Sequence, residues 1–492
     1  MGRGFELDDA VFTYVISTKA DLRFSQHTGV GEGLIISHTS KTQVVTAKQS
    51  RSDIAIIGYC IDSHGEIPRL EIPSRFLSYE WNDISEAYHF FDRFAGKYAV
   101  FFQSDGLSYI WGDASASLGI CYSFPQSGFC AASADKLLAD FCGFKISEYS
   151  KVIREASSAY SQPLPNDLTM YAEIKSLLPN HYLDCSACRP VRLKLGTQET
   201  SSPQEITEII DRTTTLVNTI VETYQQDYSF ACPLTAGTDS RVIFSFFKEN
   251  NPNLECFTFN HISFAPQSAE TAVSQQICGD FRHSHKLIDD IDAPKCLFET
   301  VRKFFGEYAD TSSVNNAYMF LKSFAGKAQA DGSIIDEVGK STQENAVPNR
   351  FLNIPFFMCK LHNYSSSTKQ ELKNYLQGIA DAGDQEHTAD LFAMEQKLGR
   401  RVGQVASLYS ICGINFLNIF NCREVILQWT RIPRKLRIKK YIPRELLRKK
   451  DSRLLEYPFN PEDKITALLK KHWLPFYLAT FAKYYVSHFF SR

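Results

Sequence analysis

The strongest constraint on the fold is an alternation of apolar runs and helical segments in the middle of this 492-residue chain. YSFACPL and LECFTFN are short apolar runs, each followed by a segment with apolar residues at helical spacing, and HKLI provides a third run. Strands that alternate with helices form a parallel sheet on which the helices pack. We therefore predict an α/β fold for this part, followed by a mostly helical region from residue 368 onward.

The first third of the chain has a different pattern. VFTYVIST, GLIISH, IAIIGYCID, YAVFFQ and SYIWGD are rich in β-branched and aromatic residues and predict short strands. Residues 104–106, Ser-Asp-Gly, supply a hairpin turn between the last two runs. A polar stretch, GTQETSSPQ, precedes the helical pattern of residues 205–226. Because the chain is longer than one core usually supports, we predict two domains, at residues 1–195 and 205–492.

Composition limits the class of partner and the compartment. The formal net charge of −2 gives no electrostatic reason to expect a nucleic-acid partner. The 13 cysteines are scattered through apolar stretches, which is typical of thiols in a reducing compartment such as the cytoplasm. No segment has the apolar length of a secretory signal or a transmembrane helix. The aromatic residues 474–492 predict a helix that docks on the core, with peripheral contact to a membrane surface or a partner as the alternative.

LTAGTDSR, at residues 234–241, joins a predicted buried strand to the start of a helix. Gly237 allows the backbone to approach a ligand, the hydroxyls of Thr235, Thr238 and Ser240 are hydrogen-bond donors, and the helix N-terminus favours negative charge. These features suit a phosphate, and Asp239 suits a Mg²⁺ ion bridging phosphate oxygens. The segment thus indicates a site for Mg²⁺ and ATP. The alternative is an ordinary helix start, where Asp and Ser are common caps.

The same segment resembles the SGGxDS pyrophosphatase loop of ATP-dependent amidotransferases, and nearly the whole chain resembles class B asparagine synthetases and their relatives. LECFTFN and SAETAVSQQICGDFRHSHKL are similar to the strands and helix that follow this loop, DGSIIDEVGKS resembles the GEGSDE segment, and KKYIPRELL resembles the GKYxLRE segment. The resemblance implies an α+β sandwich like that of the N-terminal-nucleophile hydrolases. An α/β ATP pyrophosphatase domain would follow, with a parallel sheet of the adenine nucleotide alpha hydrolase type and a helical C-terminal part.

The resemblance also implies the reaction and the residues that perform it. The chain would be an AMP-forming carbon–nitrogen ligase, in which ATP adenylates a carboxylate, pyrophosphate leaves, and an amine attacks the acyl-adenylate to form an amide. Both substrates would be small molecules or peptides. Lys440, Asp336 and Glu337 would be catalytic, and Asp239 and Asp336 would hold Mg²⁺. The predicted ATP-binding residues are Leu234, Thr235, Ala236, Gly237, Thr238, Asp239, Ser240 and Phe259.

Four positions depart from the family pattern. Thr235 and Ala236 replace the Ser and the first Gly of SGG, and Ser333 stands where the family has the glutamate that handles the ammonia proton. The glutaminase chemistry requires a cysteine directly after the initiator methionine, where this chain has Gly2, and its first cysteine is Cys60. We therefore expect an inactive glutaminase domain with a scaffold or docking role and an amine other than glutamine-derived ammonia. A noncatalytic nucleotide-binding or scaffold protein is the alternative.

Three further groups of residues suggest weaker hypotheses. Cys185 and Cys188 have the spacing of a metal or redox pair but no second pair at zinc-finger distance, so we do not expect a metal there. His283 and His285 precede or begin a predicted strand, where a hydrogen-bonded structural role is the simpler interpretation. Three residues of GEYADTS could line a substrate pocket: Glu307, Tyr308 and Asp310.

Overall fold

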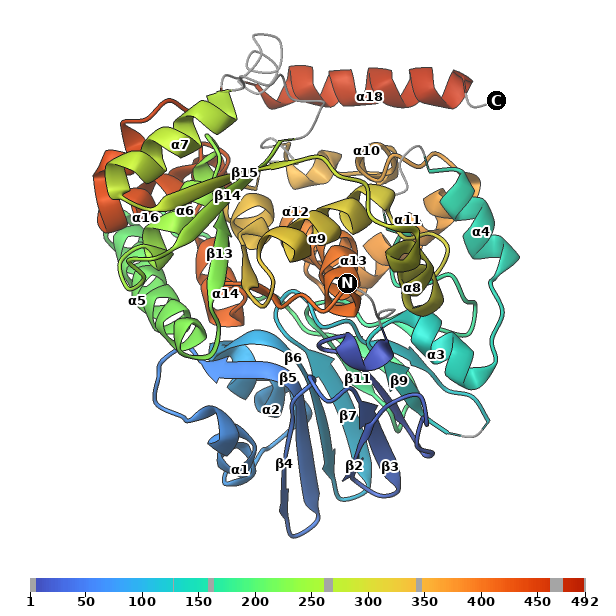
Figure 1. The fold of residues 1–492 in the computed structure, drawn as a ribbon. Coiled ribbons are helices and arrows are strands. Elements are labelled where there is room, and N and C mark those ends of the chain that lie inside the picture. The colour runs from blue at the N-terminus through green and yellow to red at the C-terminus, as the bar shows by residue number, and fades with distance from the viewer. Residues whose placement is uncertain are drawn as a thin grey trace.

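The computed structural model describes residues 6–126, 128–157, 163–260, 269–341, 347–460 and 472–490. It is a mixed α/β structure with two antiparallel sheets and one parallel sheet (Figure 1). The antiparallel sheets use strands from residues 14–192, and the parallel sheet uses strands from residues 230–418. The alternation of strands and helices thus correctly predicted a parallel sheet in the second half.

The first half contains two six-stranded antiparallel sheets. One has the order β10-β8-β9-β1-β3-β2 and the other β12-β11-β7-β6-β5-β4. The strands of the first are β1 (Tyr14–Ser17), β2 (Gln26–Val30), β3 (Leu34–His38), β8 (Cys121–Ser123), β9 (Cys130–Ala132) and β10 (Lys175–Ser176). Those of the second are β4 (Val44–Gln49), β5 (Ser52–Asp62), β6 (Phe94–Ser104), β7 (Leu107–Gly112), β11 (His181–Asp184) and β12 (Arg189–Arg192).

Both faces of these sheets are covered, which explains why the sequence of β5 is almost continuously apolar. Successive side chains of a strand point to opposite faces. Ala55 and Ile57 enter the core shared with the other sheet, whereas Ile54 and Ile56 pack on the side of α1 (Ile72–Leu77) and α2 (Ile84–Phe90). The outer face of the other sheet packs against α3 (Asp135–Cys142) and α4 (Glu148–Glu155). The result is four layers, with helices on the outside and two sheets between them.

The predicted hairpin between β6 and β7 is confirmed. Ser104 pairs with Leu107, so the turn is the dipeptide Asp105-Gly106. Both turn residues have positive φ, 48° and 79°, which matches the right-handed twist of the flanking strands. Gly96 in the same strand also has a positive φ, of 128°, and a side chain there would collide with the carbonyl of Tyr59 on β5.

The second half is built on a five-stranded sheet whose adjacent strands are all parallel, in the order β15-β14-β13-β16-β17. Its strands are β13 (Phe230–Pro233), β14 (Glu255–Asn260), β15 (Ser284–Asp289), β16 (Ala328–Asp331) and β17 (Phe416–Asn418). The chain runs outward from β13 to β14 and β15 on one side, and later adds β16 and β17 on the other. The order therefore reverses between β13 and β16, which is the position where open α/β sheets bind ligands.

Helices connect and cover this sheet. Those between its strands are α6 (Thr238–Phe247), α7 (Ala269–Phe281), α8 (Lys295–Phe305), α9 (Thr311–Ser323), α10 (Ile354–Lys360), α11 (Ser366–Asp381), α12 (Thr388–Phe392) and α13 (Gly403–Ile411), with the π-helical η4 (Ile335–Gly339) and η8 (Ala393–Val402). Before the sheet lies α5 (Pro203–Asp227), and after it come α14 (Arg423–Arg431), α15 (Arg434–Arg437), α16 (Tyr441–Asp451) and α18 (Trp473–Phe490). Short 3₁₀ turns are η1 (Leu7–Asp9), η2 (Arg69–Glu71), η3 (Phe91–Arg93), η6 (Asn349–Phe351), η7 (Gln385–His387) and η9 (Ser452–Leu455).

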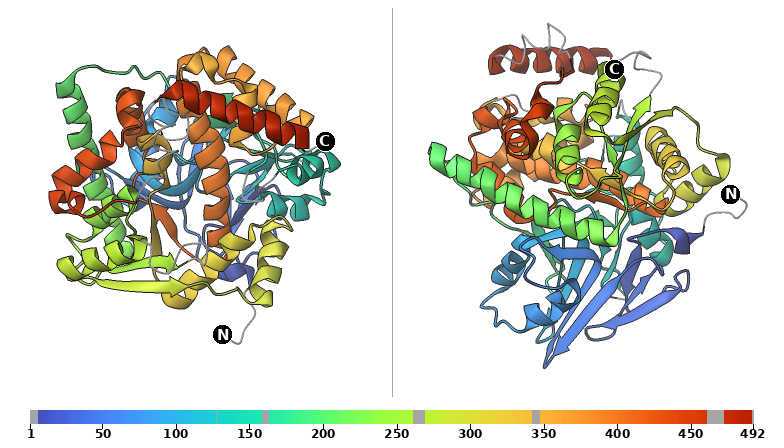
Figure 2. Two further views of the ribbon diagram at one scale, coloured as in Figure 1. Left: turned by 90° about the horizontal axis from the view of Figure 1, so that it is seen from above. Right: turned by 60° about the vertical axis from the view of Figure 1, so that its left-hand side comes forward.

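The C-terminal helix α18 lies on the outer surface, at the end of the molecule opposite the antiparallel sheets (Figures 1 and 2). It docks on α10, where Cys359 lies 3.3 Å from the carbonyl of Thr480 and Asn353 donates to the hydroxyl of Tyr477. The predicted docking is thus confirmed, and exposed apolar side chains such as Leu478 lie on the same helix. Among the described helices, none has the length and apolar character that crossing a bilayer requires.

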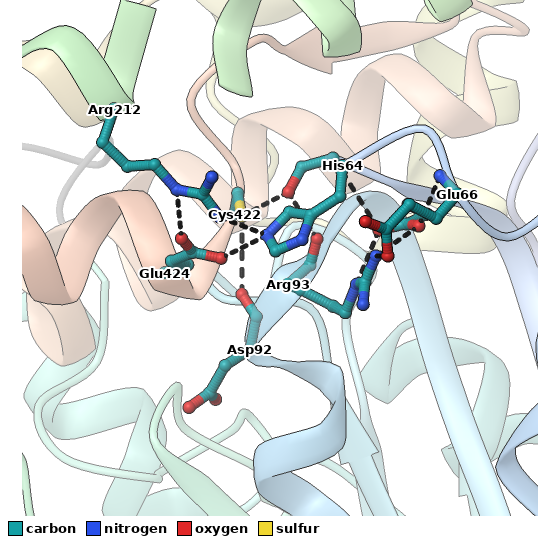
Figure 3. A network of polar contacts seen from close by, with 9 residues as sticks. His64, Glu66, Asp92, Arg93, Arg212, Cys422 and Glu424 are labelled. Carbon is teal, nitrogen blue, oxygen red and sulfur yellow. Dashed lines mark hydrogen bonds and ion pairs between the residues drawn. The ribbon is translucent and has the colours of Figure 1, made fainter. Parts of the chain in front are cut away.

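Polar contacts join the two halves where the chain leaves β17 (Figure 3). His64 of the first half lies 2.8 Å from Glu424, and Arg212 of α5 donates to the same carboxylate at 2.9 Å. Nearby, the Cys422 thiol lies 3.4 Å from the carbonyl of Asp92. Because these contacts link residues about 150 to 360 positions apart in sequence, the halves share one interface.

Lys97 on β6 is the most deeply buried cation of this interface. Its ammonium donates to the carbonyl of Ala406 at 2.9 Å and to the hydroxyl of Ser410 at 2.6 Å, both on α13. Burial lowers the pKa of Lys97 to about 7, although the charges of Asp113 and Asp331 act in the opposite direction. Holding this ammonium away from water therefore destabilises the folded protein at neutral pH.

We expect Lys97→Met to raise the melting temperature at pH 7 by about 2 °C. The folded-state pKa is depressed, so the unfolded chain binds more protons between about pH 7 and pH 10.5, and stability rises with pH across that window. The variant should lose this slope, because methionine does not titrate and Ser410 keeps its bond to the carbonyl of Ala406. Thermal unfolding from pH 7 to 10 measures both effects. Lys48→Met, at an exposed pair, is the control, and a lower melting temperature for Lys97→Met would contradict the prediction.

Candidate functional site at the parallel sheet

The loop after β13 and the segment after β16 meet at the point where the strand order reverses. The first delivers Asp239 to the first turn of α6, and the second delivers Asp336 in η4. The N-cap of α6, Gly237, makes no side-chain capping bond, so the first backbone N–H groups of the helix keep their capacity for an external acceptor. An uncapped helix N-terminus at this position in an α/β sheet is suited to bind a phosphate.

The loop itself is closed by internal hydrogen bonds. The Thr235 hydroxyl accepts from the backbone N–H of Gly237 at 3.0 Å and lies 3.0 Å from the Ser240 hydroxyl, which also accepts from the Thr235 N–H. We expected these hydroxyls to contact a ligand, and the bonds of Thr235 and Ser240 show that these two also order the turn. Ala236 is buried and has no left-handed conformation, so its methyl group is accommodated without backbone strain.

Arg241, which the sequence analysis did not single out, fixes this loop from behind. Its guanidinium is fully buried and donates at 3.0 Å to the carbonyl of Ala236 and to the carbonyls of Leu454 and Tyr457. It also lies over the ring of Phe459 at 4.1 Å. The arginine therefore ties the nucleotide-loop candidate to the segment after α16. Arg241, the last residue of LTAGTDSR, therefore holds the loop in place rather than binding a ligand.

Lys340 is the residue that unites the two predicted metal ligands. Its ammonium donates to Asp239 at 2.6 Å and lies 2.6 Å from Asp336. Burial would lower the pKa of Lys340, but the two carboxylates raise it above its ordinary value. Burial and the charge of Asp336 raise the pKa of Asp239, while Lys340 and Lys440 oppose that rise. The four side chains form one electrostatic group, which we name the carboxylate–lysine cluster.

The arrangement does not fit a resident divalent ion shared by Asp239 and Asp336. Mg²⁺ binds through one or two carboxylates at about 2.1 Å, and one oxygen of Asp239, Oδ1, is buried without a hydrogen-bond partner among the described residues. Nevertheless, the ammonium of Lys340 stands between the two carboxylates. Within the described residues no group of three or more acidic, histidine or cysteine side chains could hold a metal. An ion bridging both aspartates would have to displace Lys340.

The other predicted site residues take different positions. Glu337 is buried and lies 3.7 Å from the ammonium of Lys397 on η8, so it faces away from open solvent. Lys440 precedes α16 in a left-handed conformation, with φ 60°, and its charge reaches Asp239. Phe259 lies near the carboxyl end of β14, half-buried and 5.1 Å from the ring of Phe257. All three come from elements that surround the same edge of the sheet.

Ser333 is held by two residues that the sequence analysis missed. Its hydroxyl donates to Asp331, the last residue of β16, at 2.6 Å, and the amide of Asn418 at the end of β17 donates to the same carboxylate at 2.7 Å. Burial raises the pKa of Asp331. The position where the family has a glutamate is therefore part of a buried polar network between two strand ends.

The two histidines have structural contacts. His285 lies 2.9 Å from the hydroxyl of Thr258, which donates to the carbonyl of Leu234 at 2.5 Å. His283 contacts the ring of Phe244 edge-on, and burial lowers the pKa of both imidazoles. His285 therefore supports the strand that enters the loop. Cys185 does not belong to this region, because it lies in the turn between β11 and β12 of an antiparallel sheet.

Two of the GEYADTS residues that we predicted to line a substrate pocket do line cavities, and the substrate role stays a prediction. Tyr308 lines two adjoining cavities of about 80 and 300 Å³, and Asp310 lines the larger one. Glu307 instead lies 3.7 Å from Arg302 and is exposed. The carboxylate–lysine cluster borders neither of these cavities.

Cys60, the first cysteine of the chain, is buried in β5, and burial raises its pKa well above the ordinary value. A thiol that is neither ionised nor accessible is a poor nucleophile. We expect no glutamate release when the protein is incubated with glutamine. Iodoacetamide should label the exposed Cys188 and Cys296 in the native protein and leave Cys60 unmodified. Glutamate release that Cys60→Ala abolishes would contradict this prediction.

No model of a known protein family matches the chain, and no curated protein matches it either.

Proposed function

We propose that this chain is an ATP-dependent ligase of the asparagine-synthetase type, acting without glutamine hydrolysis. One observation carries the proposal: an uncapped helix N-terminus, two carboxylates and two lysines converge where a parallel sheet reverses its strand order. This combination suits the triphosphate of ATP, because the helix and the lysines attract phosphate oxygens while the carboxylates orient the lysines.

The proposed reaction has two steps. An oxygen of the substrate carboxylate attacks the α-phosphorus of ATP, the bond to the bridging oxygen of pyrophosphate breaks, and an acyl-adenylate forms. An amine then attacks the acyl carbon, AMP leaves with the electron pair of the broken bond, and the amine loses a proton. Magnesium would arrive with ATP as part of the substrate and supply charge neutralisation to its phosphates.

In this proposal the residues of the chain have distinct tasks. The N–H groups at the start of α6 bind phosphate, and Lys440 stabilises charge on the α-phosphate and the departing pyrophosphate. Lys340 provides the cation between Asp239 and Asp336 and compensates part of their negative charge. Glu337, paired with Lys397, orients η4 against η8. The first half contributes a scaffold or docking surface, and we place the reaction in the cytoplasm.

The rival function is a nucleotide-binding scaffold without catalysis, and a specific observation favours it. The hydroxyls of Thr235 and Ser240 are bonded to each other, and Lys340 occupies the space between the carboxylates. A protein that has lost catalysis could retain both features as structural contacts.

Incubation with ATP and a panel of carboxylates tests the proposal. We expect AMP and pyrophosphate as products, and exchange of labelled pyrophosphate into ATP that Asp239→Asn abolishes. Asp289→Asn is the matched control, because Asp289 lies at the end of β15, an edge strand, and is exposed. Formation of ADP would refute the mechanism, and ATP binding without exchange across the panel would favour the scaffold.

A further inference from the structure

The smaller cavity at the junction of the two halves is lined by polar groups from both. Its volume is about 80 Å³. A cavity of this size can hold several water molecules or, instead of them, one small polar group. The first half contributes the hydroxyls of Ser133, Thr169 and Ser176, and the second contributes Arg400, Gln404 and Ser407 from η8 and α13. The cavity is thus a composite of elements that are distant in sequence.

Arg400 places a buried positive charge in this cavity. It is buried, and its terminal nitrogen donates to the carbonyl of Leu168. Its Nε is buried without a hydrogen-bond partner among the described residues. Burial lowers the pKa of Arg400, and the charges of Asp135 and Asp167 offset only part of that effect. Leaving a buried guanidinium without its own acceptors is costly unless a ligand provides them.

A second arginine strengthens the positive character of the cavity. Arg154 of α4 also lines it and is also buried, and burial together with the charge of Arg400 lowers the pKa of Arg154 to about 10. Both side chains are therefore charged at neutral pH. The positive field of each disfavours the other, and an anion between them would relieve that repulsion.

The acidic residue of the cavity, Asp135, favours the charged forms of both arginines but does not cancel their combined charge. Its two oxygens accept from the backbone N–H groups of Lys136 at 2.8 Å and Met170 at 3.2 Å. Burial raises its pKa, so its negative charge is disfavoured. With two guanidinium groups and one carboxyl group, the lining carries a net positive charge in either state of Asp135.

We propose that this cavity binds a small organic carboxylate through Arg400, with Arg154 as the second cation. A guanidinium matches a carboxylate as a planar, two-pronged donor. The Ser133 hydroxyl, which accepts from the backbone N–H of Tyr14, has a proton to donate to the same oxygens. The rest of the ligand would extend into the adjoining recess of about 300 Å³, which shares Phe305, Tyr308 and Gln404. This site gives the first half a role in ligand binding, and it does not depend on the chemistry proposed for ATP.

Thermal unfolding and calorimetry of the full chain, without nucleotide, test the site. The probes are acetate, malonate and succinate, with sodium chloride at equal ionic strength and inorganic phosphate for comparison. We expect at least one carboxylate to raise the melting temperature of the wild type, and Arg400→Gln to weaken its binding at least tenfold. Arg51→Gln, at an exposed position, should bind as the wild type does.

Arg400→Lys covers the case in which Arg400→Gln does not fold, which circular dichroism would reveal. Lysine keeps the charge and loses the two-pronged geometry, so the affinity for the carboxylate should fall without being lost. The proposal is overturned if no carboxylate stabilises the wild type, if binding is unchanged in the folded Arg400 variant, or if phosphate alone binds.

Discussion

Lys340→Ala is expected to create a divalent-cation site between Asp239 and Asp336, where the ammonium of Lys340 stands in the wild type. Without the ammonium, the carboxylate oxygens of Asp239 and Asp336 face each other at no more than about 5 Å, because each lies 2.6 Å from the same nitrogen. Two negative charges at that separation repel by about 3 kcal/mol at an effective dielectric constant of about 20. A divalent ion relieves this repulsion, so Mn²⁺ should bind the variant at least tenfold more tightly than the wild type.

Electron paramagnetic resonance of Mn²⁺ measures this binding directly, with no need for a substrate. Lys439→Ala is the matched control, since Lys439 is exposed and is not among the charges that act on Asp239. The double variant Lys340→Ala with Asp239→Asn should lose the new site. Two results together would contradict the prediction: wild-type protein binds Mn²⁺ as tightly as Lys340→Ala does, and Asp239→Asn removes that binding. In that case Lys340 does not occupy the position of the ion.

Lys440→Met should reduce pyrophosphate exchange by about 100-fold to 1,000-fold while leaving the affinity for ATP nearly unchanged. The loss corresponds to about 3–4 kcal/mol, the size seen when one group that stabilises transition-state charge is removed. An effect on the rate without an effect on ATP affinity would indicate that Lys440 acts mainly on the charge that develops during the reaction. Lys439→Met, one residue earlier and exposed, should retain full exchange.

A second variant tests whether Lys440 acts in the reaction or only supports the structure. Lys440 has a φ of 60°, a conformation that costs a non-glycine residue about 1 kcal/mol and costs glycine almost nothing. Lys440→Gly should therefore lose exchange, while relief of this conformation offsets part of the stability lost with the side chain. A folded Lys440→Gly variant that keeps exchange would contradict the catalytic role.

Local sequence signals located the elements of this fold with uneven success. The long runs of β5 and β6, the Asp105-Gly106 turn and the helix α5 have strong local patterns and lie where they were predicted. The strands β16 and β17 were not predicted, because they have only four and three residues and β16 reads Ala-Gln-Ala-Asp. Strands that short are stabilised by their neighbours in the sheet, which is a tertiary effect.

For the candidate site, too, the local sequence predicted some residues and missed others. Asp239, Asp336, Glu337 and Lys440 were chosen from motifs, and the structure brings Asp239, Asp336 and Lys440 into one electrostatic group. The sequence did contain a signal for Lys340, since it follows Asp336 by four residues, a spacing that pairs opposite charges on a helix. That signal could not indicate that the same lysine also reaches Asp239, which lies about 100 positions away.

The sequence by itself determined the two kinds of sheet and the loop LTAGTDSR as the candidate phosphate site, because strand periodicity and helix starts depend on neighbouring residues. Only the tertiary structure decided three matters: the loop hydroxyls bond to each other, Lys340 stands between the two carboxylates, and Arg154 and Arg400 meet in a cavity between the halves. The last two depend on contacts between residues that are distant in the chain, whereas the first depends on the conformation of the turn. Burial then sets their charges, and no local pattern contains that information.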